Sequence, residues 1–111
     1  NPARLLDPRY AAPEYFDRRF GVVDAATDIY QLGAVLFALY AGRPPYGGPF
    51  GAVRDAVTSP MTPVPGDVAT GVPAAVDEVV AKAMATRKLT RYETIEHLGA
   101  ELRAVREAGE G

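Results

Sequence analysis

Long helical patterns of apolar residues alternate along the chain with segments rich in proline and glycine. From Asp28 to Ala41 no residue after the first is charged, and no side of the expected helix is clearly polar. A helix with this pattern is buried on all its faces. Gly42 can adopt the left-handed conformation that ends helices, and prolines follow within three residues. We therefore predict a central core helix over residues 28–41, which is too short to span a membrane.

Three further segments place apolar residues at helical spacing. They cover residues 50–58, 73–85 and about 94–107. The last of these helices has two candidate starts, because Thr90 and Thr94 are both suitable N-caps. No segment alternates convincingly between apolar and polar residues, so no strand is predicted. The expected fold class is all-α, with the helices joined by long ordered loops.

Residues 1–26 contain three prolines and no regular period, apart from a single turn expected at 14–18. The segment is too rich in large apolar residues for a free linker, so it is predicted to pack against a core. These residues are Leu5, Leu6, Tyr10, Tyr15, Phe16, Phe20, Val22 and Val23. Tyr10 and Tyr15 are accordingly expected to be packing residues. Residues 59–71 also lack a helical period and are expected to form a surface connection.

Composition narrows the classes of function. With 111 residues, 48% hydrophobic and 23% charged, the chain is at most one ordinary globular domain. A net charge of −2 gives no indication of a nucleic-acid partner. The absence of cysteine excludes disulfides and thiol chemistry, and it fits a reducing compartment such as the cytoplasm. The single histidine, His97, cannot form a two-histidine metal site and is predicted to be a partly buried structural residue.

The chain opens at Asn1 without an initiator methionine, and its first residues look like the middle of a loop. We therefore expect a piece of a longer protein. A helix that is buried on all sides needs neighbours on all sides. Part of the covering of residues 28–41 is thus expected to lie outside this piece.

Four short motifs follow one another along the chain. They are YAAPE at Tyr10–Glu14, TDIYQLG at Thr27–Gly33, GRPPY at Gly42–Tyr46, and Arg91 followed by Tyr92. In this order and spacing they resemble the eukaryotic-like protein kinase family, over the back half of its large lobe. By this resemblance YAAPE ends the activation segment, TDIYQLG begins helix F, GRPPY follows that helix, and Arg-Tyr precedes the last helix. Each motif alone is weak, whereas four in order over nearly the whole chain are strong.

The resemblance also implies a domain assignment. The chain would be a partial protein kinase domain, the helical C-terminal half of its C-lobe. Residues 1–26 would be the end of the activation segment and the P+1 loop, and residues 27–111 would hold helices F, G, H and I. The four predicted helices take these names in order.

Kinase chemistry needs further motifs that this chain lacks. They are a Gly-rich loop over the phosphates, a strand lysine, a catalytic-loop aspartate and a magnesium-binding DFG aspartate. No G-x-G-x-x-G, H-R-D or D-F-G occurs in the sequence. We therefore expect no catalytic, cofactor-binding or metal-ligating residue in this chain, and the resemblance implies ATP and Mg²⁺ for the parent protein only.

The resemblance gives structural or substrate-side roles to a set of residues, namely Asp7, Tyr10, Ala12, Pro13, Glu14, Asp28, Gly33 and Arg91. Glu14 matches the glutamate of the family's Ala-Pro-Glu triplet, and Arg91 matches the arginine that pairs with it. A bidentate contact between them would tie the activation segment to the end of the lobe. The alternative is two separate solvated charges.

Asp28 has two candidate roles. By resemblance it is the helix F aspartate, which accepts hydrogen bonds from backbone amides of the catalytic loop. The local alternative is an N-cap, because Asp28 and Gln31 have the spacing of a capping box and a carboxylate suits the positive end of the helix dipole. The family role is favoured.

Asp7 departs from the family pattern. It lies three residues before Tyr10, where Ser/Thr kinases have a threonine that contacts the catalytic aspartate. A carboxylate there would raise the pKa of its neighbour or repel it. This leaves both activity and substrate class open, although Leu6 in place of the expected glycine also allows a loop of different length.

Arg18, Arg19 and Arg43 have two interpretations, a phosphate-binding cluster or solvated loop charges. The second is favoured, because neither a helix N-terminus nor a glycine nest accompanies these arginines.

Three functional hypotheses follow. The first is a fragment of a serine/threonine protein kinase, in which the Tyr10–Glu14 region shapes the site next to the phosphoacceptor and helix G offers a docking face. Its partners would be a protein substrate and the upstream N-lobe and catalytic loop of the same chain. The second is a pseudokinase or interaction scaffold, for which Asp7 is the only hint. The third is an unrelated helical binding domain.

Overall fold

The computed structural model describes residues 7–110, and this part of the chain contains helices and no strand. The helices are α1 (Pro13–Phe16), α2 (Ala25–Ala41), α3 (Phe50–Val57), α4 (Ala74–Ala83) and α5 (Ile95–Glu110), with 3-10 turns η2 (Pro8–Tyr10), η3 (Arg18–Phe20), η4 (Pro65–Asp67) and η5 (Lys88–Thr90). Each predicted helix is present within a few residues of its expected bounds. The predicted all-α fold class is therefore confirmed.

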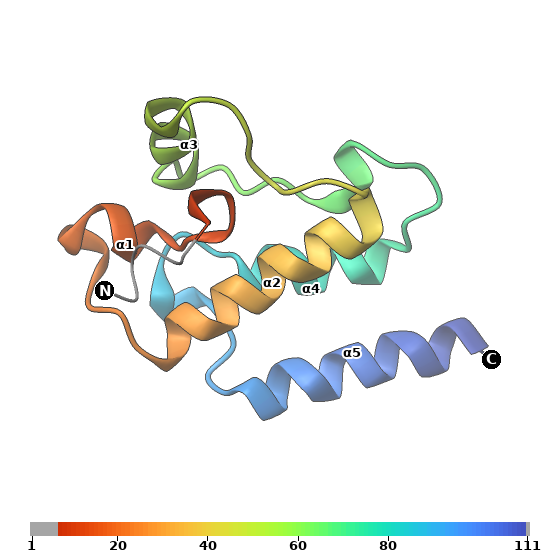
Figure 1. The fold of residues 1–111 in the computed structure, drawn as a ribbon. Coiled ribbons are helices and arrows are strands. Elements are labelled where there is room, and N and C mark those ends of the chain that lie inside the picture. The colour runs from red at the N-terminus through yellow and green to blue at the C-terminus, as the bar shows by residue number, and fades with distance from the viewer. Residues whose placement is uncertain (1–6, 111) are drawn as a thin grey trace.

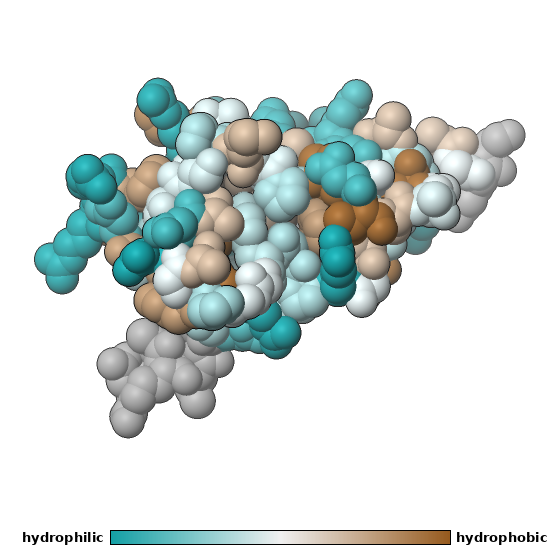
Figure 2. Space-filling view, turned by 90° about the horizontal axis from the view of Figure 1, so that it is seen from above, coloured by the Kyte–Doolittle hydropathy of each residue, from teal (hydrophilic) through white to brown (hydrophobic). Residues whose placement is uncertain are grey.

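Helix α2 crosses the middle of the molecule, with α4 against it (Figure 1). Helix α5 packs against α4 on the side opposite α3. Seen from the side of α3, the surface is mostly hydrophilic, with apolar patches between the polar residues (Figure 2). None of the described helices combines the length and the apolar content of a membrane span.

The start of α2 differs from the expected one. Its N-cap is Asp24, whose carboxylate accepts a hydrogen bond from the Ala26 amide at 3.0 Å. Thr27 completes a capping box, because its Oγ1 accepts a hydrogen bond from the Asp24 amide at 3.0 Å. The expected capping box between Asp28 and Gln31 is therefore wrong. An aspartate and a threonine three residues apart cap one turn earlier and leave Asp28 inside the first turn.

The prediction that α2 is buried on all its faces is also wrong for the described part of the chain. One face is buried and carries Thr27, Ile29, Tyr30, Gly33, Ala34 and Phe37. Large apolar side chains on the rest of the helix are exposed, including Leu32, Val35 and Leu39, the last of which exposes 73% of its surface. The helix ends as expected, with Gly42 in the left-handed conformation at φ 77° and its amide bonded to the Ala38 carbonyl at 2.9 Å.

The core consists of two adjoining clusters. The first joins α2 to α3 and α4 through Ala12, Tyr30, Ala34, Phe37, Val53, Val57, Val76, Val80 and Met84. The second joins α2 and α4 to α5 through Ile29, Val79, Ala83, Tyr92 and Leu98. Gly33 allows α2 to approach α4 closely, because a Cβ there would lie 2.8 Å from both the Ala83 Cβ and the Met84 Cγ.

The segment before α2 packs against this core, as its composition indicates. Tyr10 and Phe16 contact the first cluster, and the Phe16 ring lies 5.6 Å from the Phe50 ring. The prediction is wrong for Tyr15, Val22 and Val23, which expose 37%, 73% and 50% of their surface and are not core residues. The expected packing of Leu5 and Leu6 falls outside the described residues.

Two local predictions near α5 are now decided. Thr94 caps the helix, since its Oγ1 accepts the His97 amide at 3.0 Å, whereas Thr90 ends the turn η5. His97 is exposed rather than partly buried, because it lies on the outer side of the first turn of α5. Its ring stands edge-on to Tyr92 at 5.0 Å, and its Nε2 lies 3.6 Å from the Glu101 carboxylate.

Candidate functional site

The contact expected between Glu14 and Arg91 is present. Glu14 lies in the first turn of α1, which begins at Pro13. The buried Ala12 directly precedes this helix. Arg91 follows the turn η5. Nη1 of Arg91 donates to Oε2 of Glu14 at 2.7 Å, and Nη2 donates to Oε1 at 2.9 Å. Neither side chain has any accessible surface, so the alternative of two solvated charges is wrong.

The remaining N–H groups of Arg91 also have acceptors. Nε donates to the Ala85 carbonyl at 2.8 Å, Nη1 to the Ala26 carbonyl at 3.0 Å, and Nη2 to the Thr86 carbonyl at 3.3 Å. The guanidinium also lies 5.0 Å from the centre of the Tyr30 ring. All five donors of the guanidinium are therefore used, which offsets the cost of removing its charge from water.

Glu14 has a second donor. Oγ1 of Thr27 donates to Oε2 of Glu14 at 2.7 Å. Burial by itself raises the pKa of the Glu14 carboxyl, but the hydrogen bonds from Arg91 and Thr27 outweigh burial, and the net pKa is lowered. Glu14 is thus a carboxylate at neutral pH.

Thr27 connects this ion pair to another. The Asp24 carboxylate, which caps α2, accepts a hydrogen bond from Nζ of Lys88 at 2.6 Å. The same Nζ donates to the Val22 carbonyl at 2.6 Å. Two observations favour a glycine at position 21. Its φ of 112° is rarely adopted by other residues, and a Cβ there would lie only 3.1 Å from the Lys88 Cδ.

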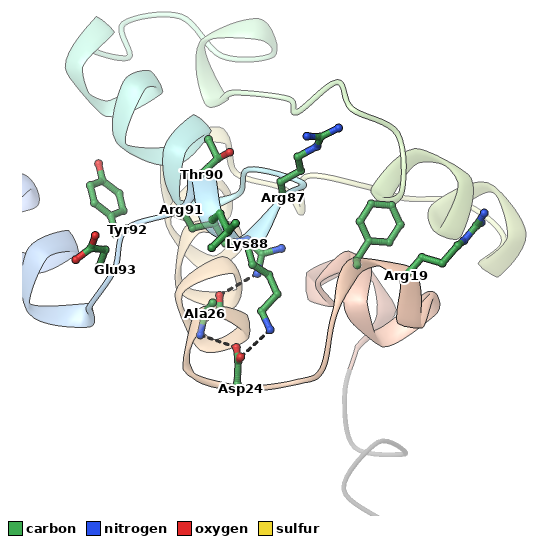
Figure 3. A pocket seen from close by; sticks show the side chains of 11 residues that line it. Arg19, Asp24, Ala26, Arg87, Lys88, Thr90, Arg91, Tyr92 and Glu93 are labelled. Atoms are coloured by element: carbon green, nitrogen blue, oxygen red, sulfur yellow. Dashed lines mark hydrogen bonds and ion pairs between the residues drawn. The ribbon is translucent and has the colours of Figure 1, made fainter.

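These side chains form one ring, which we call the charged network: Lys88, Asp24, Thr27, Glu14 and Arg91. The Arg91 amide closes the ring by donating to the Lys88 carbonyl at 3.1 Å. Figure 3 shows Lys88 pointing at Asp24 and the guanidinium of Arg91 reaching the Ala26 carbonyl. The network thus joins α1, the start of α2 and the turn before α5, which are far apart in sequence. Sequence reasoning missed Asp24, Thr27 and Lys88, although the capping-box spacing of the first two was a visible signal.

A pocket of about 930 Å³ lies beside the charged network (Figure 3). Its cations are largely engaged, because Lys88 binds Asp24 and Arg19 binds Asp17 with a shortest contact of 2.7 Å. Arg18 and Arg43 do not line this pocket. Arg18, Arg19 and Arg43 therefore do not form a phosphate-binding cluster. This agrees with the favoured interpretation, that they are solvated loop charges.

Asp7 has a partner of its own. Its carboxylate accepts the Arg9 amide at 3.0 Å and binds the guanidinium through Nε at 3.0 Å and Nη2 at 2.6 Å. The side-chain hydrogen bond from Arg9 lowers the pKa of the Asp7 carboxyl. This charge is therefore held by its own turn, η2.

The other candidate residues are dispersed. Tyr10, Ala12 and Pro13 lie at the front of α1, whereas Gly33 lies at the contact of α2 and α4. Asp28 is exposed on the first turn of α2. Within residues 7–110 no three histidine or carboxylate side chains converge as metal ligands do.

Known proteins resemble this chain in sequence. No protein-family model matches it. Serine/threonine-protein kinase PknE of Mycobacterium tuberculosis is 38% identical over 95 residues, and the match covers 86% of this chain. The probable serine/threonine-protein kinase PknB of Corynebacterium glutamicum is 35% identical over 99 residues, which cover 85% of this chain. The probable serine/threonine-protein kinase PknB of Bifidobacterium longum is 35% identical over 92 residues, which cover 78% of this chain.

The homologues of this chain are serine/threonine protein kinases. The match covers only 16%, 15% and 12% of the length of the three relatives, so this chain corresponds to a part of each. The order of its motifs, its helical fold and the buried contact between Glu14 and Arg91 all agree with this relationship. The interpretation as an unrelated helical domain is therefore not supported.

Proposed function

We propose that this chain is the C-terminal part of the large lobe of a serine/threonine protein kinase. The whole protein transfers the γ-phosphoryl group of ATP to a protein hydroxyl. In this assignment residues 1–26 are the end of the activation segment and the P+1 loop, and α2, α3, α4 and α5 are helices F, G, H and I. The observation that carries the proposal is the fully buried bidentate contact of Glu14 with Arg91 in a chain homologous to such kinases.

The chain's own contribution is to hold and shape the substrate side. The charged network anchors α1, and with it Tyr10–Glu14, to the start of α2 and to the end of the lobe. Because α1 is a single turn, it cannot hold this position by itself. Helix α3 follows on the same side and contacts both η2 and α1. Substrate recognition is the function that this arrangement supports.

The exposed apolar face of α2, which carries Leu32, Val35 and Leu39, is where the rest of the lobe packs in this proposal. Such a face is unfavourable in water and indicates a contact surface. Asp28 is exposed at the front of the same helix and is free to accept amide hydrogen bonds from the catalytic loop. The upstream N-lobe and the catalytic loop are thus the expected partners within the protein, and the cytoplasm, where ATP is present, is its expected location.

The residues of this chain do not fit a site for ATP and Mg²⁺. The motifs that bind phosphates and magnesium are absent from its sequence, and no three of its described carboxylates converge as metal ligands do. Those residues would come from other parts of the protein. No step of phosphoryl transfer is therefore assigned to residues of this chain.

Asp7 favours a second candidate, a pseudokinase that keeps the fold and has lost the chemistry. A carboxylate replaces the threonine that the family resemblance leads us to expect. However, Arg9 holds this carboxylate in a bidentate contact. Because the Arg9 charge offsets that of Asp7, the repulsion of a catalytic aspartate is reduced, and the enzyme remains the preferred proposal.

The test is phosphoryl transfer by the purified full-length protein that carries this chain. With radiolabelled ATP, Mg²⁺ and a generic protein acceptor, we expect label on serine or threonine. A pseudokinase would transfer none with any divalent metal, and that result would contradict the proposal.

A further inference from the structure

A second pocket, of about 490 Å³, lies between the front of the described segment and the loop that follows α2. It is lined by Arg9, Arg43, Pro44, Pro45, Tyr46, Gly47 and Gly48. Its lining thus includes two arginines and no carboxylate. The pocket beside the charged network differs in the charge of its lining, because the carboxylates of Asp24 and Glu93 offset its cations.

The two arginines still have donors to offer. Arg43 is exposed, and within residues 7–110 its side chain makes no ion pair or hydrogen bond. Arg9 binds Asp7 through Nε and Nη2, whereas its Nη1 donates to no acceptor in the same part of the chain. Even with Asp7 counted, this pocket keeps a net positive charge, so it favours an anionic ligand.

Part of the pocket wall is conformationally restricted. Gly42 ends α2 in the left-handed conformation, and two successive prolines follow Arg43. Proline fixes φ, so Arg43 projects from a turn that loses little entropy on binding. Tyr46 packs partly buried against the first core cluster, and burial raises the pKa of its hydroxyl, which therefore adds no negative charge. Gly47 and Gly48 complete the lining, and a Cβ at either would meet nothing within 4 Å, so the space beside them is open.

We propose that this pocket binds an aspartate or glutamate side chain of the protein substrate, with Arg43 and Arg9 as specificity-determining residues. The inference rests on the proposed function, which places Tyr10–Glu14 and α3 on the substrate side. Arg9 directly precedes Tyr10, and the loop that carries Arg43 leads into α3. A planar guanidinium matches a carboxylate in shape and charge, so two of them around one pocket select an acidic side chain over a basic one.

The experiment uses the full-length protein and a set of acceptor peptides. The peptides are identical except that glutamate, glutamine or lysine stands at one position at a time on either side of the acceptor hydroxyl. At one position we expect kcat/KM to be about fivefold higher with glutamate than with lysine, as for a well-placed exposed ion pair. Arg43→Gln should remove this preference, and Arg43→Glu should reverse it.

Arg103→Glu is the matched control, because Arg103 is an exposed arginine on α5 and the charge changes by the same amount. This variant should keep the preference for glutamate. An active protein with the same glutamate-to-lysine ratio in parent and Arg43→Glu would overturn the inference and leave the proposed function standing.

An absence of transfer to all acceptors would instead overturn the proposed function. The affinity of the protein for the same peptides, measured by fluorescence anisotropy, would then still test whether the pocket binds an acidic side chain. A glutamate-to-lysine affinity ratio that Arg43→Glu does not reverse would overturn the inference as well.

Discussion

At the scale of single residues, the charged network depends on complete pairing. Every N–H of Arg91 has an acceptor, and Glu14 has donors from two elements. A fully paired buried charge is tolerated, whereas a buried charge that has lost its partner is costly. Removing one member of the network is therefore expected to affect stability far more than removing a surface charge.

Arg91→Ala in the full-length protein should lower the free energy of unfolding of the lobe by about 3–5 kcal/mol, because Glu14 is left buried without its partner. Denaturant unfolding measures the change. Arg103→Ala removes an exposed arginine and should cost less than about 0.5 kcal/mol. Equal effects of the two variants would contradict a stabilising role for the buried pair.

The pH dependence of stability provides an independent test of Glu14. Its pKa is lowered from the ordinary value of 4.5, so its carboxylate contributes stability that is complete above pH 4.5 and is lost as the pH falls through the lower, folded-state pKa. Glu14→Gln resembles the protonated residue at all pH values. The free energies of unfolding of parent and variant should therefore differ at pH 7 and converge in acid. Parallel curves would show that the carboxylate is not coupled to Arg91.

At the scale of elements, the contact between α2 and α4 depends on a glycine rather than on a large side chain. The sequences of both helices predict that they are buried, but the distance between them is set where Gly33 meets Ala83 and Met84. Close packing leaves no free volume for an added methyl group. The glycine is thus part of the packing of the core.

Gly33→Ala should destabilise the lobe by about 1–3 kcal/mol, because its Cβ would lie 2.8 Å from the Ala83 Cβ. Gly99→Ala is the control on α5, where the nearest atom is Nη1 of Arg103 at 3.7 Å. Since alanine favours a helix over glycine, this second variant should stabilise by about 0.5–1 kcal/mol. Thermal unfolding distinguishes the two signs. A stabilising Gly33→Ala would show that the helices can move apart at little cost.

At the scale of the whole molecule, α2 is the central helix but is covered on one side only within residues 7–110. Large apolar side chains on its other faces are exposed, and water is an unfavourable environment for a continuous apolar face. The proposal that the rest of the kinase lobe covers this face makes a direct prediction about the full-length protein.

Leu39→Asp should lower the unfolding midpoint of the full-length protein strongly, with a cost of about 2–4 kcal/mol, because a charge would enter the interface with the rest of the lobe. Met61→Asp is the control. Met61 is 81% exposed against 73% for Leu39, but it lies in a loop and is expected to stay exposed. Equal and small effects of the two substitutions would mean that nothing covers α2.

The amino-acid sequence by itself determined the fold class, the order of the helices and the partners Glu14 and Arg91. Periodicity and helix-ending residues such as Gly42 are local signals, and the family motifs carry the long-range pairing. Only the tertiary structure decided that Lys88 reaches Asp24, that Thr27 binds Glu14, and that Arg9 and Arg43 share a pocket. Each of these depends on which segments meet in space, and a side chain's own sequence neighbourhood does not contain that information. The same reason explains why the apolar pattern of α2 overstated its burial, since the pattern shows what a helix requires and not which neighbours are present.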